Sequence, residues 1–151
     1  MQAHEIMNTQ VYIVKEGNTV RSVIEKFIEY GISGLPVVND RNEIVAYISD
    51  GDIMRYIGKH KNIVIDAYYF VHVLSGDDKD FEERVKTILN LNVLSIAKNK
   101  VSKVAWDEEL ENIAAILGNK QIKKLPVERN GVLVGIISRG DVIRHAFHKL
   151  L

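Results

Sequence analysis

Apolar residues recur with two different periods in the first part of the chain, and turn-forming residues separate the stretches. Short runs rich in valine, isoleucine and tyrosine predict strands. After the first run, apolar residues recur every three or four positions from Val20 onward, which is typical of an amphipathic helix that ends at Gly31. The predicted elements are strands at 11–14, 35–38 and 44–48, a helix at 20–30, and a second helix that Ser49 begins and that runs to about Gly58.

The same order of elements, namely strand, helix, strand, strand and helix, occurs again toward the C-terminus. Pro36 and Pro126, the only two prolines, each lie between a leucine and a valine, 90 positions apart. After the polar turn the offset becomes 89, so that Ser49 aligns with Ser138. A hairpin loop tolerates such a change of length, which supports an internal repeat. The second set of predicted elements is a strand at 101–104, a helix from about 108 to 117, strands at 125–127 and 132–137, and a helix from 141 to the end.

A longer stretch joins the two repeats and divides the chain into three parts. We expect a first unit at 1–58 that begins with a short lead-in, a connecting insert at 59–95, and a second unit at 96–151. The insert contains the run Ile63-Val-Ile65 and is too apolar for a flexible linker. An acidic run followed by apolar residues predicts a helix at 77–89. We therefore expect the insert to be partly helical and to pack on the domain.

Composition narrows the possible classes of protein. The 151 residues have a net charge of zero and include no cysteine. The neutral balance disfavours a nucleic-acid partner, and the missing thiols exclude disulfides and cysteine chemistry. The most apolar window, residues 67–74, is far too short to cross a bilayer, and the N-terminus lacks the pattern of a signal peptide. We therefore expect a cytoplasmic protein with no membrane partner.

A Ser-x-Gly-Asp motif ends the last strand of each unit and has two explanations. The Ser can cap the following helix while the Asp, three residues later, accepts a hydrogen bond from the Ser backbone N–H, which is the capping-box arrangement. Alternatively, the carboxylate can accept hydrogen bonds from two ligand hydroxyls at once, because it has only acceptor atoms. Spacing alone favours the cap, since helix caps are common.

The repeated motifs resemble those of the cystathionine-β-synthase (CBS) domain family. The first unit contains Gly31-Ile-Ser-Gly-Leu-Pro-Val-Val and Ile48-Ser-Asp-Gly-Asp-Ile, and the second contains Ile122-Lys-Lys-Leu-Pro-Val and Gly135-Ile-Ile-Ser-Arg-Gly-Asp-Val. The chain is similar to a tandem CBS pair, often called a Bateman module, over nearly its whole length. The resemblance implies an α/β (α+β) fold in which two β-α-β-β-α units pack sheet to sheet with pseudo-twofold symmetry. It also implies two clefts that bind adenosine compounds, a homodimer, and regulation of an attached or partner protein.

The resemblance further implies which residues surround each cleft. In this family the adenine rests on the first strand and on the stretch before the proline, while the Ser and Asp of the repeated motif face the ribose and phosphate. The residues expected around the second-unit cleft are Lys100, Val101, Ser102, Ile122, Lys123, Lys124, Leu125, Pro126, Ser138, Arg139 and Asp141. The residues expected around the first-unit cleft are Gln10, Val11, Tyr12, Ile32, Ser33, Gly34, Leu35, Pro36, Ser49 and Asp52. Tyr12 and Lys100 depart from the small or hydroxyl residues that are usual in the first strand.

Formal charge distinguishes the two predicted clefts, because it changes from −1 in the first unit to +3 in the second. This count compares Ser33, Gly34 and Asp50 with Lys123, Lys124 and Arg139. An anionic nucleotide should therefore prefer the second cleft, while the first stays empty or takes adenosine or S-adenosylmethionine. If residues 123 and 124 are extended, their side chains alternate, and only one of the two lysines faces the cleft.

Two classes of function fit these observations. The first is a stand-alone regulatory module that binds an adenosine nucleotide such as AMP or ATP and signals to a partner that the sequence does not identify. The second is a structural dimerisation module with empty clefts, and S-adenosylmethionine or adenosine is the alternative ligand. We expect no enzyme, catalytic cofactor or metal site, because no nucleophile–base pair, metal cluster or Walker glycine loop stands out. The helix faces around Val23/Phe27 and Ile143/Phe147 predict the homodimer surface.

Overall fold

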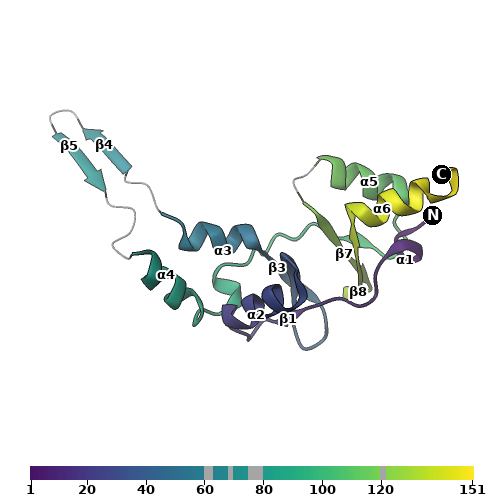
Figure 1. Cartoon of the computed structure of the whole chain (residues 1–151), viewed down its shortest axis with the longest axis horizontal. Helices are drawn as coiled ribbons and strands as arrows, with labels where there is room; N and C mark the ends of the chain where they lie inside the picture. Colours follow the sequence, from purple (N-terminus) through teal and green to yellow (C-terminus); the bar gives the residue numbers. More distant parts are fainter. Residues whose placement is uncertain (60–62, 68–69, 75–79, 120–121) are drawn as a thin grey trace.

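Two three-stranded sheets, one from each repeat, form the body of the protein (Figure 1). The computed structural model describes residues 1–59, 63–67, 70–74, 80–119 and 122–151. The elements of the first half are α1 (Ala3–Ile6), β1 (Val14–Lys15), α2 (Val20–Tyr30), β2 (Gly34–Val38), β3 (Ile44–Ser49) and α3 (Asp50–Ile57). The connection contains β4 (Ile63–Ala67), β5 (Phe70–Leu74), α4 (Phe81–Ile88) and η1 (Val93–Ser95). The second half contains β6 (Val104–Ala105), α5 (Leu110–Asn119), β7 (Lys124–Arg129), β8 (Val132–Ser138), α6 (Arg139–Phe147) and η2 (His148–Leu150).

Strand pairing is repeated between the two sheets, residue by residue. β1 runs parallel to β2 with Val14 opposite Val37, and β6 runs parallel to β7 with Val104 opposite Val127. β2–β3 and β7–β8 are antiparallel hairpins, and the register shifts at the same place in each, directly after Val37 or Val127. Each unit thus has the order strand, helix, strand, strand, helix, which confirms the predicted α/β fold built from two repeated units.

The first strand of each unit is shorter than predicted, because the chain crosses between the sheets just before it. The backbone of Asn8 exchanges two hydrogen bonds with Ile136 of β8, at 2.9 and 3.0 Å, and Lys98 pairs in the same way with Tyr47 of β3, at 2.9 Å in both directions. The chain then leaves the other unit's sheet and joins its own. Within the described chain, the crossing residues 10–13 and 100–103 belong to no strand. Of the strands predicted at 11–14 and 101–104, only the last residue of each is therefore observed in a strand, in β1 and β6 respectively.

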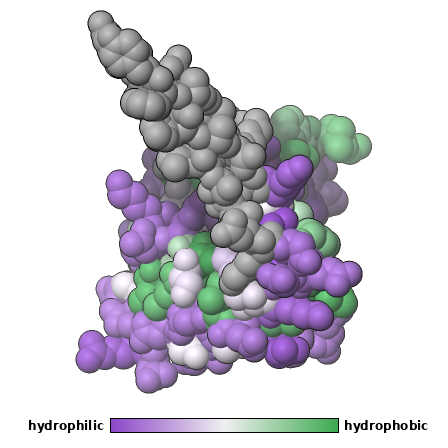
Figure 2. All heavy atoms as spheres, turned by 90° about the vertical axis from the view of Figure 1, so that its left-hand side faces the viewer, coloured by the Kyte–Doolittle hydropathy of each residue, from purple (hydrophilic) through white to green (hydrophobic). Residues whose placement is uncertain are grey.

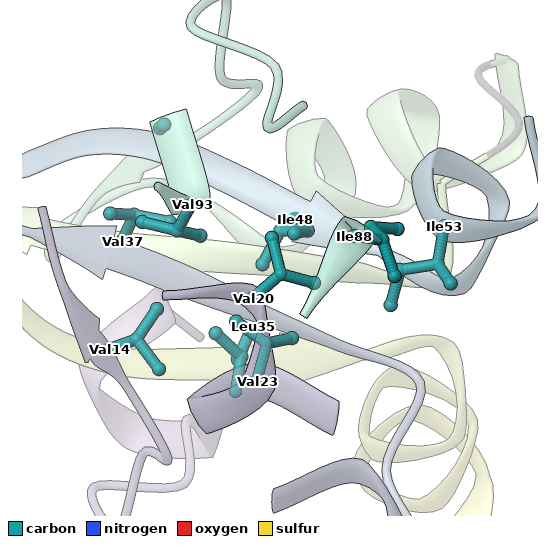
Figure 3. Close-up of a cluster of buried hydrophobic side chains, with 10 residues drawn as sticks. Val14, Val20, Val23, Leu35, Val37, Ile48, Ile53, Ile88 and Val93 are labelled. Atoms are coloured by element: carbon teal, nitrogen blue, oxygen red, sulfur yellow. The ribbon is translucent and has the colours of Figure 1, made fainter. Parts of the chain in front are cut away.

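Each half has its own apolar core, and each core includes residues from outside its repeat. The first core gathers side chains of β1, α2, β2 and β3 with Ile88 of α4 and Val93 of η1 (Figure 3). The second core includes Ala3 and Ile6 of α1, both buried. The stretch 1–10 is therefore more than a lead-in, since its helix packs in the core of the second unit. A four-residue helix has no readable apolar period, so its role depends on contacts with a distant part of the chain.

The connecting segment contains a β-hairpin and a helix. β4 and β5 pair antiparallel, and in Figure 1 they project beyond α3 and α4. The helix predicted at 77–89 is observed as α4, which begins after Asp80. The Asp80 side chain caps it by accepting a hydrogen bond from the Glu83 N–H at 2.8 Å. The start of the predicted helix, residues 77–79, lies outside the described residues.

Helix α4 packs on the first unit through its C-terminal end. Ile88 is buried in the first core, whereas Phe81, which the apolar pattern placed on the same face, is exposed. The buried Arg84 donates from Nε to the carbonyl oxygen of Ile57, 2.9 Å away, at the end of α3. The helix therefore satisfies a backbone carbonyl of α3 as well as burying apolar surface. None of the helices in the described part of the chain combines the length and apolar character of a membrane span.

Candidate functional site

A cavity of about 230 Å³ lies where the two units meet. It borders the pairing of Tyr47 with Lys98, and both repeats contribute to its walls. The first unit supplies the start of β2, the end of β3 and the first turn of α3, through Ser33, Gly34, Tyr47, Ser49, Asp50 and Asp52. The second unit supplies the crossing stretch and the start of β7, through Lys98, Lys100, Val101, Ser102, Ile122, Lys123, Lys124 and Pro126.

Asp52 is a buried carboxylate in the cavity wall, and three donors hold it. Ser49 donates to Oδ2 from its backbone N–H at 2.9 Å and from Oγ at 3.3 Å, and Arg55 forms an ion pair with Oδ1. Only 3% of the Asp52 side chain is exposed. A carboxylate has roughly four lone-pair directions, so these donors leave room for a further one, such as a ligand hydroxyl. Capping and ligand binding are therefore compatible at this residue.

Tyr47 brings an aromatic ring to the cavity, where the aligned residue of the second unit is Ile136. The ring lies against Gly34, and a Cβ added to this glycine would lie 2.6 Å from the Tyr47 hydroxyl oxygen. Any larger residue at position 34 would therefore displace the ring. Burial, with a smaller contribution from the nearby Asp50 carboxylate, raises the pKa of Tyr47 to about 12. The hydroxyl is protonated near neutral pH and can donate a hydrogen bond.

Four lysines line the cavity from the side of the second unit. Lys98 and Lys100 belong to the segment that precedes β6, in which Lys98 pairs with Tyr47 of β3. Lys123 and Lys124 lie at the start of β7. The sequence predicted that only one of Lys123 and Lys124 would face a cleft, but both line this one. Strand β7 begins at Lys124, so the residue before it need not follow the alternation of a strand. Two carboxylates oppose the four lysines, which leaves the cavity with an excess of positive charge.

The structure groups the predicted site residues differently from the two clefts expected from the sequence. Of the second-unit set, Lys100, Val101, Ser102, Ile122, Lys123, Lys124 and Pro126 line the cavity. Of the first-unit set, Ser33, Gly34, Ser49 and Asp52 line the same cavity. Because the chain crosses between the sheets, the Ser-x-Gly-Asp motif of the first unit faces the crossing stretch of the second. The expected charge contrast therefore does not apply to this cavity, since residues 33–34 and 123–124 share it.

The other predicted residues lie outside this cavity. Leu35 and Leu125 are fully buried in the two cores. Tyr12 stacks on Tyr30 at the end of α2, with 4.1 Å between the ring centroids. The predicted residues that do not line the cavity are Gln10, Val11, Tyr12, Ile32, Leu35, Pro36, Leu125, Ser138, Arg139 and Asp141. Because the two units are repeats, residues 10–12 and 138–141 should face a second cleft that is equivalent to this cavity. We call it the counterpart cleft.

Asp141 repeats the local structure of Asp52 away from the cavity. Ser138 donates to its Oδ2 from the backbone N–H at 2.8 Å and from Oγ at 2.9 Å. The Asp141 N–H donates back to Ser138 Oγ at 3.1 Å, which completes the capping box. Arg144 pairs with Oδ1 at 2.7 Å, and 20% of the Asp141 side chain is exposed. The chain thus contains two copies of one motif, and only the first lines this cavity.

Sequence reasoning missed Tyr47 and Lys98 as lining residues. A signal for Tyr47 existed, because residues two apart on a strand share a face and Ser49 was already predicted to face a ligand. Lys98 gives no local signal, since its position depends on pairing with a strand far along the chain. Within the described ranges, no three metal-binding side chains come together.

Comparisons with known proteins agree with this architecture. The sequence model of the CBS domain family matches residues 3–59 and 95–148. The uncharacterized protein MJ1426 of Methanocaldococcus jannaschii is 30% identical to the chain, and the match covers 95% of this chain and 89% of that protein. The chloroplastic CBS domain-containing protein CBSX2 of Arabidopsis thaliana is 31% identical, and the match covers 90% of this chain and 58% of that protein.

Solved structures share the fold over almost the whole chain. The crystal structure of CBSX2 in complex with AMP matches with a TM-score of 0.74 at 22% identity, covering 99% of this chain and 98% of that chain. Protein MJ1225 of Methanocaldococcus jannaschii matches with a TM-score of 0.76 at 22% identity, covering 96% of this chain and 47% of that chain. At these identities, the two likenesses establish the arrangement of the two units and not the ligand.

Proposed function

The chain belongs to the CBS domain family, with one CBS unit in each half, and on this basis we propose that it is a regulatory module that binds an adenosine nucleotide between its units. The observation that carries the proposal is the cavity, in which the buried carboxylate of Asp52 faces lysines of the second unit. The AMP complex of CBSX2, a protein of the same fold, supports an adenosine nucleotide as the ligand. Signalling to a partner protein is part of the proposal.

Each part of such a nucleotide has a suitable group in the cavity. Asp52 accepts a hydrogen bond from a ribose hydroxyl, as an acceptor-only group can. Val101 and Ile122 provide apolar contacts for the adenine beside the ring of Tyr47. The phosphate meets the lysines of the second unit. S-adenosylmethionine and adenosine are the alternative ligands, and both lack the phosphate that the lysines would bind.

The nucleotide first occupies the cavity of Asp52, rather than a cleft around Asp141. Two lysines that the sequence placed with Asp141 line the cavity of Asp52 instead. In the counterpart cleft, the residue aligned with Ser102 is Tyr12, whose ring is already stacked on Tyr30. The counterpart cleft is therefore the weaker site.

The decisive experiment compares Asp52→Asn with Asp141→Asn by calorimetric titration with AMP. Asp52→Asn should weaken binding by about tenfold or more, because a hydrogen bond to a charged group contributes about 1.5–3 kcal/mol. Asp141→Asn should leave the affinity for AMP within about twofold of the wild-type value, although it alters the equivalent helix cap and the equivalent ion pair with an arginine in the second unit. Similar melting temperatures of the two variants would show that folding does not cause the difference. The opposite ranking of the two affinities would place the site at the counterpart cleft.

A structural module with empty clefts is the second candidate function. The repeated capping boxes favour it, because they explain the Ser-x-Gly-Asp motifs without a ligand. A ligand that binds only the native state must raise the melting temperature. Thermal unfolding with millimolar AMP, ATP or S-adenosylmethionine separates the two functions. An unchanged melting temperature with all three would favour the structural module.

The proposed module is a homodimer. On α6, Ile143 and Phe147 are 61% and 53% exposed, as expected of an unpaired helix face. Val23, which the sequence placed on the interface, is buried in the first core and is not available. Figure 2 views the molecule from the hairpin end and shows further apolar patches between polar side chains. The exposed face of α6 supports association through this helix.

A further inference from the structure

We infer that this cavity selects nucleotides by the number of their phosphate charges and takes a nucleoside di- or triphosphate in preference to a monophosphate. The inference rests on the proposed nucleotide site and specifies its ligand class. It starts from the gathering of Lys98, Lys100, Lys123 and Lys124 around one cavity. These ammonium groups come from two separate segments that meet only in the folded chain.

The four lysines have no carboxylate partner in the described part of the chain. None of them forms an ion pair there, whereas the nearby Lys103, which does not line the cavity, pairs with Glu128 at 3.0 Å. Four ammonium groups at one cavity repel one another, and a polyanion is the ligand that relieves this repulsion. The site is therefore built for more negative charge than the protein itself supplies.

The two carboxylates in the wall do not balance this charge. Asp52 is already paired with Arg55. Asp50 is exposed at the start of α3, and its Oδ1 accepts a hydrogen bond from the Gly51 N–H at 2.8 Å. A phosphate monoester carries about two negative charges near neutral pH, and each further phosphate adds about one more. A monophosphate thus leaves ammonium groups unmatched, and a triphosphate matches all four.

The group that suits a ribose and the groups that suit phosphates lie in different units. The carboxylate that suits a ribose comes from α3 of the first unit, and the ammonium groups come from the second unit. A nucleotide whose ribose meets Asp52 extends its phosphates across the cavity toward the lysines. Lys98, Lys100 and Lys123 are exposed, so salt screens their attraction, and the preference should weaken as ionic strength rises.

The test is a calorimetric titration of the full chain with adenosine, AMP, ADP and ATP in low salt without divalent cations. Affinity should increase by about tenfold or more from AMP to ATP. The double variants Lys98→Gln/Lys100→Gln and Lys123→Gln/Lys124→Gln should each weaken ATP binding by about tenfold and AMP binding by less than about threefold. The matched control Lys86→Gln/Lys149→Gln makes the same change of net charge at residues that do not line the cavity, and it should keep the ATP preference.

The outcomes separate this inference from the proposed function. Equal affinity for AMP and ATP, with both weakened by Asp52→Asn, would overturn the charge selection and leave the nucleotide site in place. An affinity for ATP that inorganic tripolyphosphate equals, and that Asp52→Asn does not change, would support charge selection and overturn adenosine recognition. Loss of the ATP preference in the Lys86→Gln/Lys149→Gln control would assign the effect to overall charge and overturn the inference. Binding of none of these ligands would overturn both.

Discussion

At the residue scale, Tyr47 is the side chain whose acid–base chemistry its surroundings change most clearly. Its hydroxyl lies against Gly34, and burial and the Asp50 carboxylate raise its pKa to about 12. An exposed tyrosine has a pKa of about 10. Between these two values the folded chain keeps a proton that the unfolded chain has lost, so proton release favours the unfolded state.

The free energy of unfolding should therefore fall as pH rises from about 10 to about 12, and Tyr47→Phe should remove this part of the fall. Below pH 10 the tyrosine is protonated in both states, so it adds no pH dependence there. Urea titrations at pH 9 and pH 11 should show that the wild type loses about 1 kcal/mol more than the variant. A second pair of titrations at pH 7 and pH 8 should show equal changes in the two proteins. Identical alkaline slopes would mean that the ring is solvated in solution.

Residue pairs also show which part of the site was predictable. The Ser49 and Asp52 pair follows from a local motif, and the structure places both at the cavity. Tyr47 could have been found from the alternation of a strand. In contrast, the sequence could not predict that Gly34 and Lys124 line the same cavity. These two residues align with each other in the repeat, so the repeat places them in separate clefts. Their common location depends on how one unit packs against the other.

At the element scale, helices and hairpin strands were predictable wherever their apolar period is local. The helix predicted at 20–30 is α2, and the strands predicted at 35–38 and 44–48 are β2 and β3, to within a residue. The elements that were missed include the hairpin of β4 and β5, whose pairing is local, and α1, whose position distant contacts define. Helix α1 has four residues, and its place is fixed by Ala3 N–H donating to the Glu108 carbonyl at 2.8 Å. No period within the first ten residues could reveal that pairing.

Helix α1 should therefore stabilise the second unit, which it precedes by about a hundred residues. Ile6 is 4% exposed in the second core, so Ile6→Ala should cost about 2–4 kcal/mol of unfolding free energy. Trp106, the only tryptophan, can report the transition by fluorescence, because its ring centroid lies 5.0 Å from that of His4.

The control for this measurement is Ile28→Ala, because Ile28 is 79% exposed. It should change the unfolding free energy by less than about 0.5 kcal/mol. An Ile6→Ala chain as stable as the wild type would show that α1 is detached from the second unit in solution.

At the scale of the whole molecule, the proposed dimer depends on helix faces that the fold leaves uncovered. Both predicted pairs of apolar residues lie on helices, but their environments differ. Val23 is buried in the first core and Phe27 is partly buried against it, so this pair offers less apolar surface for an interface. Ile143 and Phe147 of α6 remain exposed. The dimer surface is thus expected on α6 and its neighbours, rather than equally on both halves.

Light scattering at micromolar concentration should give the mass of two chains for the wild type. The double change Ile143→Lys with Phe147→Lys should give one chain, because it places charges in an apolar contact. Phe81→Lys is the matched control, since Phe81 is equally exposed but lies on α4 of the connecting segment. Wild-type protein with the mass of a single chain would contradict the dimer. Dissociation by Phe81→Lys instead would move the interface to the connecting segment.

The exchange of core residues between the halves determines how the chain can be divided. The first core takes Ile88 and Val93 from beyond the hairpin of β4 and β5, and the second takes Ala3 and Ile6 from before β1. A cut within that hairpin would leave two fragments, each without a strip of apolar surface that only the other supplies. Such fragments are expected to complete their cores by binding each other. The two repeats are therefore complementary parts of one folding unit, and the repeat boundary is not a place where an autonomous domain ends.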